Sequence, residues 1–207
     1  MKIKNLKTAG RVPFARILMV LALAIVFVAC EKEDDNTAMN AAKTAESAKD
    51  FKRGNSAPAP GNESIAEIAI GAGFNELVAA LVFVDEELDA GLVNLFLTGS
   101  DQFTVFAPTD DAFNALYKEL GIDAISDLPA DLVLDVLFYH VTEGRRAANS
   151  VVPPARLRKI TTLLGEYFSV SKEGKIYAIG NEANIVAPNI SASNGIIHVI
   201  DSVILPF

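Results

Sequence analysis

The stretch Phe103–Phe113 reads FTVFAPTDDAF, and its periodicity changes at Pro108. Before the proline, the residues are typical of a β-strand, and we expect a strand over 102–106. After it, apolar residues recur at the spacing of an α-helix that begins near Thr109. Thr109 or Asp110 is the predicted N-cap, because short polar side chains accept hydrogen bonds from the free N–H groups of the first turn. The stretch therefore predicts a strand, a turn and a helix.

A second stretch, Asn194–Pro206, follows about ninety residues later and reads NGIIHVIDSVILP. It opens on Asn194 and Gly195, a strong turn signal, and then alternates. We expect a strand with Ile197, Val199, Val203 and Leu205 on one side and His198, Ile200, Ser202 and Ile204 on the other.

Together with Tyr139 and His140 between them, these two stretches resemble the homology boxes and the Tyr-His motif of the fasciclin domain family, over roughly residues 62–206. The resemblance implies an α+β fold, a fasciclin-like β-wedge of short strands flanked by several helices. It also implies a non-enzymatic interaction module of secreted or cell-surface proteins, in which the Tyr-His motif has been implicated in receptor adhesion. A fold alone does not name a ligand.

The N-terminus predicts export. A cationic segment precedes the uncharged stretch Ile17–Ala29, which is too short to span a bilayer comfortably, so residues 1–29 are predicted to be a signal peptide. Cys30 follows, and the junction resembles the lipobox of bacterial lipoproteins, which implies lipid attachment to Cys30 and anchoring in the cell envelope at the outer membrane. The acidic run Glu31–Asp35 either solvates the chain or resembles signals for export to the outer face.

Removal of residues 1–30 takes away five of the 18 basic residues and none of the 26 acidic ones, which leaves a net charge of −13. Such a chain is not attracted to nucleic acid by its overall field. Cys30 is the only cysteine, so the remainder holds no disulfide. Residues 30–60 lack an apolar stripe and are predicted to be a flexible tether. We expect one domain over 61–207.

Within that domain, helical spacing begins near Ser64 and continues to Leu81. The segment Val82–Leu92 is interpreted as an insertion or an extended helix. Pro129 suits the first position of a helix that passes through Tyr139 and His140 and closes near Gly144. Downstream, the apolar segment Ile160–Leu164 ends at Gly165. A hairpin formed by Tyr167–Ser171 and Lys175–Ile179 follows, and Asn184–Ala187 and the final strand complete the sheet.

No pattern of metal ligands, nucleotide-binding glycines or catalytic nucleophiles is present, so we expect no cofactor, no metal and no enzymatic activity. His198 is interpreted as a core imidazole bonded to backbone or to a carboxylate, Asp110 or Asp201. Tyr139 and His140 are candidate interaction residues, although their place on a helix favours burial. The expected structural motif residues are Thr109, Asp110, Asn194, Gly195, His198 and Asp201.

Residues 61–207 contain eight basic and 20 acidic residues, and five of the basic ones lie within fifteen positions: Arg145, Arg146, Arg156, Arg158 and Lys159. This basic band is either a solvated loop or a contact for an acidic polysaccharide or a matrix or surface protein. The favoured function is a lipid-anchored, non-catalytic adhesion or interaction protein. The alternative is an envelope enzyme or small-ligand-binding protein, which would show a deep pocket with convergent polar groups. The sequence does not indicate an oligomeric state.

Overall fold

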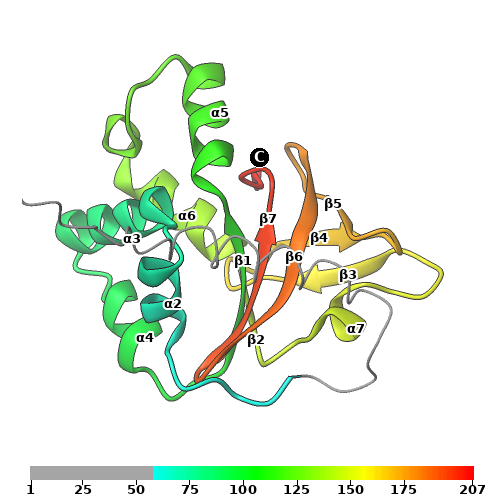
Figure 1. Ribbon diagram of the computed structural model, residues 1–207. Coiled ribbons are helices and arrows are strands. Elements are labelled where there is room, and N and C mark those ends of the chain that lie inside the picture. The colour runs from blue at the N-terminus through cyan, green and yellow to red at the C-terminus, as the bar shows by residue number, and fades with distance from the viewer. Residues whose placement is uncertain (1–57) are drawn as a thin grey trace, which may run out of the picture. The chain divides into compact units, whose positions relative to one another are not determined.

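The computed structural model describes residues 58–207, all of which belong to the second of two units into which the chain divides, Asp35–Phe207. The predicted signal peptide, Cys30 and residues 30–57 of the predicted tether lie outside the described residues. Helices and a seven-stranded sheet form two layers, with most helices on one side of the long strands (Figure 1). The predicted α+β fold class is confirmed.

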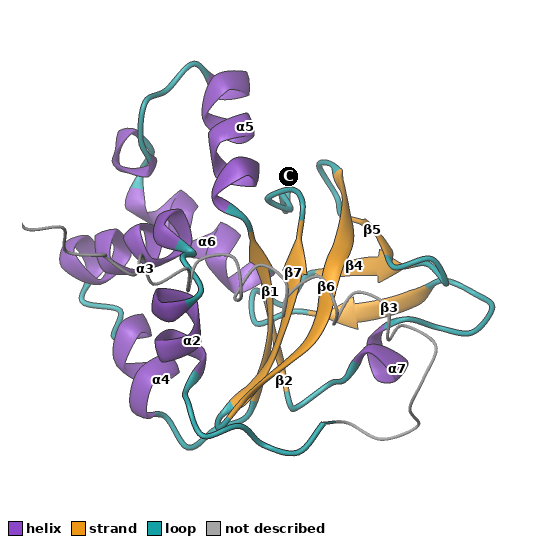
Figure 2. Cartoon of the chain, in the orientation of Figure 1, coloured by secondary structure: helices purple, strands orange, loops and turns teal. Residues whose placement is uncertain are grey.

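Five α-helices and one 3-10 turn form the layer that covers the sheet (Figure 2). In chain order they are α2 (Ile65–Gly71), α3 (Asn75–Leu88), α4 (Leu92–Thr98), α5 (Asp110–Leu120), η2 (Ile125–Asp127) and α6 (Ala130–Tyr139). A single short turn of helix, α7 (Ala148–Val151), lies apart from them, near β3. The helix α3 is long, so the predicted extended helix is confirmed for residues up to Leu88, whereas α4 was not predicted.

The strands are β1 (Phe103–Pro108), β2 (Val141–Glu143), β3 (Arg158–Thr161), β4 (Tyr167–Val170), β5 (Lys175–Tyr177), β6 (Glu182–Ala192) and β7 (Gly195–Ile200). Their order across the sheet is β2-β1-β7-β6-β5-β4-β3. All neighbours are antiparallel except β1 and β7, which run parallel from Phe103 opposite Gly195 to Pro108 opposite Ile200. The two stretches that stand out in the sequence are therefore direct neighbours in the sheet.

The sheet curls until its two edges meet. The N–H of Leu163, just after β3, donates to the carbonyl of Val141 in β2 at 2.8 Å, and Thr142 Oγ1 donates to the carbonyl of Thr161 at 2.7 Å. These bonds give both edge strands partners that an open sheet would lack. They also enclose the inner face of the sheet.

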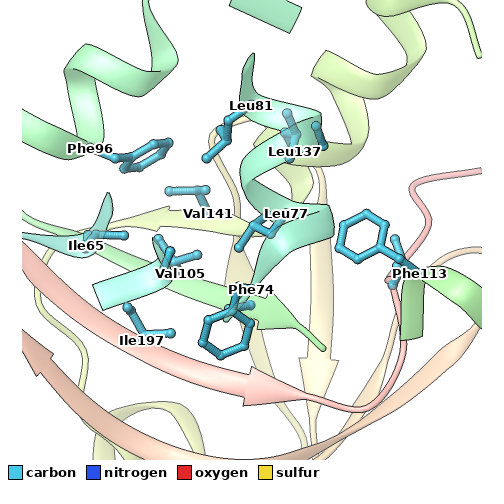
Figure 3. Close-up of a cluster of buried hydrophobic side chains, with 14 of the residues drawn as sticks. Ile65, Phe74, Leu77, Leu81, Phe96, Val105, Phe113, Leu137, Val141 and Ile197 are labelled. Atoms are coloured by element: carbon cyan, nitrogen blue, oxygen red, sulfur yellow. The ribbon is translucent and has the colours of Figure 1, made fainter. Parts of the chain in front are cut away.

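The curled sheet separates two hydrophobic cores. The inner core includes Phe106, Phe168 and Ile200, and the helix-side core lies between the sheet and helices α2 to α6. Figure 3 shows part of the helix-side core, which includes Phe74, the residue just before α3, and Val105 of β1. Every residue of β1 and β7 is buried, because one face of each strand packs in each core.

In the last strand, the expected division of alternating residues between the two sides of the sheet is confirmed. Ile197, Val199 and Val203 pack in the helix-side core, and Ile200 and Ile204 pack in the inner core. The strand itself stops at Ile200, earlier than expected. Similarly, α6 ends at Tyr139 rather than near Gly144, because the chain turns at His140 into β2, whose backbone pairs with β1.

The turn between β6 and β7 is formed by Ser193 and Asn194, and Gly195 is already the first residue of β7. Gly195 has an ordinary backbone conformation, but a Cβ at this position would collide with the carbonyl oxygen of Phe103. The buried Asn194 side chain accepts from the N–H of Ile65 at 2.8 Å and donates to the carbonyl of Phe96 at 2.9 Å. The Asn-Gly pair thus fixes helices α2 and α4 against the end of the β1–β7 pair.

Asp110 links the starts of two helices. Thr109 is the N-cap of α5, so Asp110 occupies the first helical position. Its carboxylate accepts from the N–H of Glu76 at 3.0 Å and from Asn75 Nδ2 at 2.9 Å. The N-cap residue of α3, Phe74, supplies no side-chain bond of its own. Asp110 therefore caps α3 from a distant part of the chain.

We predict that Asp110→Ala lowers the free energy of unfolding by about 1–2 kcal/mol, the usual cost of losing a helix cap. Asp111→Ala is the matched control, because Asp111 is exposed in the same turn and contributes only its interaction with the α5 dipole. The control should cost about 0.3–1 kcal/mol. Urea unfolding of the full chain measures both, and equal losses in the two variants would show that Asp110 is not the cap of α3.

Candidate functional site

The Tyr-His motif lies at the junction of α6 and β2, and both side chains are inside the protein. Tyr139 is 0% exposed, and its ring packs edge-on against Phe168 in the inner core. Its hydroxyl donates to the carbonyl of Tyr167 at 3.0 Å and accepts from the N–H of Ile179 at 3.3 Å. Burial raises the pKa of this hydroxyl. Tyr139 therefore joins α6 to β4 and the end of β5.

His140 is 3% exposed and joins the same junction to the segment after β7. The N–H of Ile204 donates to Nε2 at 3.0 Å, so Nε2 carries no proton. Nδ1 then holds the proton and donates to the carbonyl of Val136 at 2.7 Å. Since neither Tyr139 nor His140 lies on the outer surface that a protein partner would contact, the buried interpretation is the one that fits.

His198 lies in the middle of β7 with 0% exposure and is bonded only to backbone. Its Nδ1 accepts from the N–H of Asn189 at 3.3 Å, which leaves Nε2–H to donate to the carbonyl of Arg146 at 2.9 Å. The backbone interpretation is thus confirmed, and the carboxylate alternative is wrong. Asp110 caps α3 instead, and Asp201 accepts from the N–H and side-chain amide of Asn184.

Both imidazoles are neutral. Burial lowers the pKa of His140 and of His198 to about 4, because a charged ring inside the protein would lose its hydration. Protonation would also place a second N–H against the backbone N–H of Ile204 or Asn189. With both nitrogens of each ring occupied, neither histidine is free to exchange protons with a substrate or to bind a metal.

The basic band does not form one exposed patch, because Arg145 points inward. Its guanidinium donates to the carbonyls of Ala192 at 2.8 Å and Gly195 at 2.5 Å at the β6–β7 turn. It also donates to Ser191 Oγ and to the carbonyls of Pro58 and Ala59. Residues 58–60, predicted to belong to the tether, are therefore held against the domain by Arg145. Partial burial without a nearby carboxylate lowers the pKa of Arg145.

The other four basic residues of the band differ in their hydrogen bonds and in their exposure to solvent. Arg146 Nε donates to the carbonyl of Glu143, and Arg158 donates to the carbonyls of Asn149 and Ser150 at the end of α7. Arg156 is exposed. Lys159, also exposed, places its ammonium 3.9 Å from the centre of the Tyr167 ring. Within residues 58–207, none of the four forms a salt bridge with a carboxylate.

Charge is divided between the two halves of the domain. Residues 61–143, which include helices α2 to α6, contain 16 carboxylates and one basic residue, Lys118. Residues 144–207, which include β3 to β7, contain seven basic residues and four carboxylates. The helical half is therefore strongly acidic, and the strand half has a small excess of positive charge.

An apolar cavity with a volume of about 120 Å³ opens between α3, α5, η2, α6 and the segment 203–207. Apart from His140, whose nitrogens are both engaged, its walls are apolar. It lacks the convergent polar groups expected of an enzyme site. Residues 58–207 also contain no group of His, Cys, Asp and Glu placed to hold a metal ion, and none of their helices is long and apolar enough to cross a membrane.

Comparison with known proteins agrees with the resemblance in the sequence. The profile described as "Fasciclin domain" matches residues 72–206. Protein sll1483 of Synechocystis is 33% identical over 202 residues, which cover 97% of this chain and 99% of that protein. The chain belongs to the fasciclin domain family.

Immunogenic protein MPB70 of Mycobacterium bovis is 35% identical to this fasciclin protein over 117 residues, or 55% of each chain. The FAS1 domain pair of the insect cell adhesion molecule fasciclin I has a TM-score of 0.47 and 19% identity, with coverage of 63% of this chain and 45% of that one.

The fasciclin motifs therefore carry structural contacts in this protein. Two features of the site could not be predicted from the sequence: the inward clamp made by Arg145 and the apolar cavity. No charge pattern distinguishes an arginine that binds carbonyls from an exposed one. The cavity is lined by residues that any core would contain, so its only sequence signal is a set of apolar positions in α5 and α6.

We predict that the fasciclin domain loses stability as the pH falls from about 6.5 toward 4. The unfolded histidines have the ordinary pKa near 6.5 and bind protons in this range, whereas the folded ones, with pKa values of about 4, do not. The stability from neutral burial is complete above pH 6.5 and is lost below it, at up to about 1.4 kcal/mol per pH unit for each histidine. Urea unfolding at pH 7.5, 6.0 and 5.0 measures the slope.

The variants His140→Asn and His198→Gln serve as controls, because each keeps a neutral donor and acceptor near the original nitrogens. Either one should remove about half of the pH dependence in this range, whatever its effect on stability at pH 7.5. A parent protein whose stability stays constant from pH 7.5 to 5.0 would contradict the prediction.

Proposed function

We propose that this protein is a non-catalytic interaction protein of the bacterial cell envelope, held there by a lipid on Cys30 and binding an anionic polysaccharide through its strand half. The observation that carries the binding proposal is the division of charge: seven of the eight basic residues of 61–207 lie in 144–207. The anchoring part depends on the charged and apolar segments before Cys30 and on its lipobox-like context.

The proposed contact surface is the start of β3 and the loop before it, defined by Arg156, Arg158 and Lys159. Arg156 and Lys159 are exposed, and neither is neutralised by a carboxylate among the described residues. Arg158 is oriented by its bonds to the α7 carbonyls. Guanidinium groups match the fork geometry of carboxylate and sulfate groups, which are the charged groups of acidic polysaccharides. The acidic helical half would turn away from such a polymer.

An enzymatic function has no support among the described residues. The only titratable side chain that lines the apolar cavity is His140, which is neutral and doubly bonded to backbone. A general acid or base needs a free position facing the substrate. The acid–base chemistry that an enzyme would need is therefore not assembled in residues 58–207.

We predict that Cys30→Ser releases the protein from membranes, because a lipid on this cysteine is the proposed anchor. Cells expressing the parent and the variant are fractionated and washed with high salt, and lipid attachment is followed by metabolic labelling with a fatty acid. Ser47→Cys, which supplies a thiol far from the lipobox-like segment, should not restore labelling when added to Cys30→Ser. Membrane retention of an unlabelled Cys30→Ser protein would contradict the anchoring proposal.

We predict that Arg156→Gln with Lys159→Gln weakens binding to alginate or heparin at least several-fold, and that the parent's affinity falls steeply with salt because exposed charges are screened. Lys118→Gln with Lys172→Gln is the matched control, since it removes the same two charges at other exposed positions. Isothermal titration at 20 and 200 mM salt measures both. Equal loss in the two double variants would show that only net charge matters. If the protein binds an acidic protein but neither polysaccharide, the proposed polysaccharide partner is wrong.

A further inference from the structure

The apolar cavity in the helical half is separate from the contact surface proposed on β3, because no residue of β3 lines it. It extends between α5 and α6, with Leu77 from α3 and Leu205 from the last segment among its walls. Two exposed apolar side chains, Leu120 and Phe207, belong to its lining and are 49% and 61% exposed. The cavity is therefore partly open to solvent beside these side chains.

The size of the cavity limits its occupant. A cavity of about 150 Å³ lined by apolar residues stays free of water and binds benzene. The cavity here is about 120 Å³, which suits on the order of five or six carbon atoms. Because it is partly open, a longer molecule can place one end inside and extend its remainder outward past Leu120 and Phe207.

The surrounding charge limits the occupant further. Residues 110–140, which supply most of the cavity walls, contain seven carboxylates and one lysine. The net negative charge of this segment repels an anionic head group and attracts a cationic one. Inside the cavity no side chain is free to pair with a charge, because both nitrogens of His140 are engaged with backbone groups. The inserted end must therefore be a hydrocarbon.

We propose that this cavity is a binding site for a small amphiphile whose alkyl or aryl end of about six carbons fills the cavity and whose uncharged or cationic head remains at the mouth. Free fatty acids and other anionic amphiphiles are selected against. The site lies in the helical half, so it is independent of the polysaccharide surface proposed on β3, and either proposal can fail without the other.

The first test uses a series of n-alkanols from butanol to octanol with the full chain. Each methylene that enters the cavity should tighten binding by about fourfold. We expect this gain to stop near hexanol, where the cavity is full, and the methyl NMR signals of lining residues such as Leu132 and Val136 to shift. Affinity that continues to rise at the same rate to octanol, or shifts spread over the whole surface, would mean unspecific partition and overturn the proposal.

The second test compares hexylammonium, hexanol and hexanoate at low salt. We expect hexylammonium to bind several-fold more tightly than hexanoate, with the difference shrinking in 0.5 M salt because the carboxylates are then screened. Equal affinities of the cation and the anion at low salt would overturn the assigned class of ligand. Methyl shifts that appear with rising protein concentration in the absence of any ligand would identify a second copy as the occupant and also overturn the proposal.

The third test blocks the site. Val136 is half-buried in the cavity wall, so Val136→Phe should fill the space and abolish hexanol binding. Val82→Phe is the matched control: Val82 is an exposed residue of α3 outside the cavity, and its variant should bind as the parent does. Should Val136→Phe fail to fold, Leu120→Gln at the exposed mouth replaces it and should weaken binding several-fold. Parent-like binding by the blocked variant would overturn the proposal.

Discussion

The parallel pairing of β1 with β7 is the constraint on which the rest of the structure depends. The paired residues, such as Phe103 and Gly195, lie about ninety positions apart, so their meeting costs loop-closure entropy that local contacts do not repay. The compensation is burial on both faces, because every residue of the two strands is buried and each strand sends side chains into both the inner core and the helix-side core. A parallel pair needs covering on both sides, and the curled sheet and the helices provide it.

The same arrangement explains why the fasciclin motifs contain polar residues that never reach the surface. Where a helix meets a curled sheet, backbone groups at the ends of elements are left without partners, and an unpaired buried group is costly. His140 satisfies the carbonyl of Val136 and the N–H of Ile204, and Asn194 satisfies Ile65 and Phe96. Arg145 does the same for the carbonyls at the β6–β7 turn. Each of these side chains joins segments that lie far apart in the sequence.

Much of this fold could be predicted from local pattern. The change of period at Pro108 located β1 and α5, and alternation in the last stretch assigned Ile197 and Ile200 to opposite sides. The strand β2 was missed because it is three residues long and follows α6 directly at His140, where tertiary pairing with β1 overrides helical spacing. The place of Asp110 at the start of α5 could be predicted from the sequence. Its second role, capping α3, could not, because α3 lies about 35 residues earlier in the chain and meets Asp110 only in the folded structure.

The site was less predictable than the fold, because the sequence does not show in which direction a side chain points. Arg145 and Arg146 are neighbours, yet Arg145 binds internal carbonyls, whereas the backbone of Arg146 accepts from His198. A basic cluster in sequence therefore overstates the charge available to a partner. The apolar cavity shows the opposite error, because its lining residues count as core in any hydrophobic pattern. Only the spacing between α5, α6 and the last segment leaves them with room for another molecule. In this protein the conspicuous motif residues stabilise the fold, so the surfaces left for binding are those that the motifs do not mark.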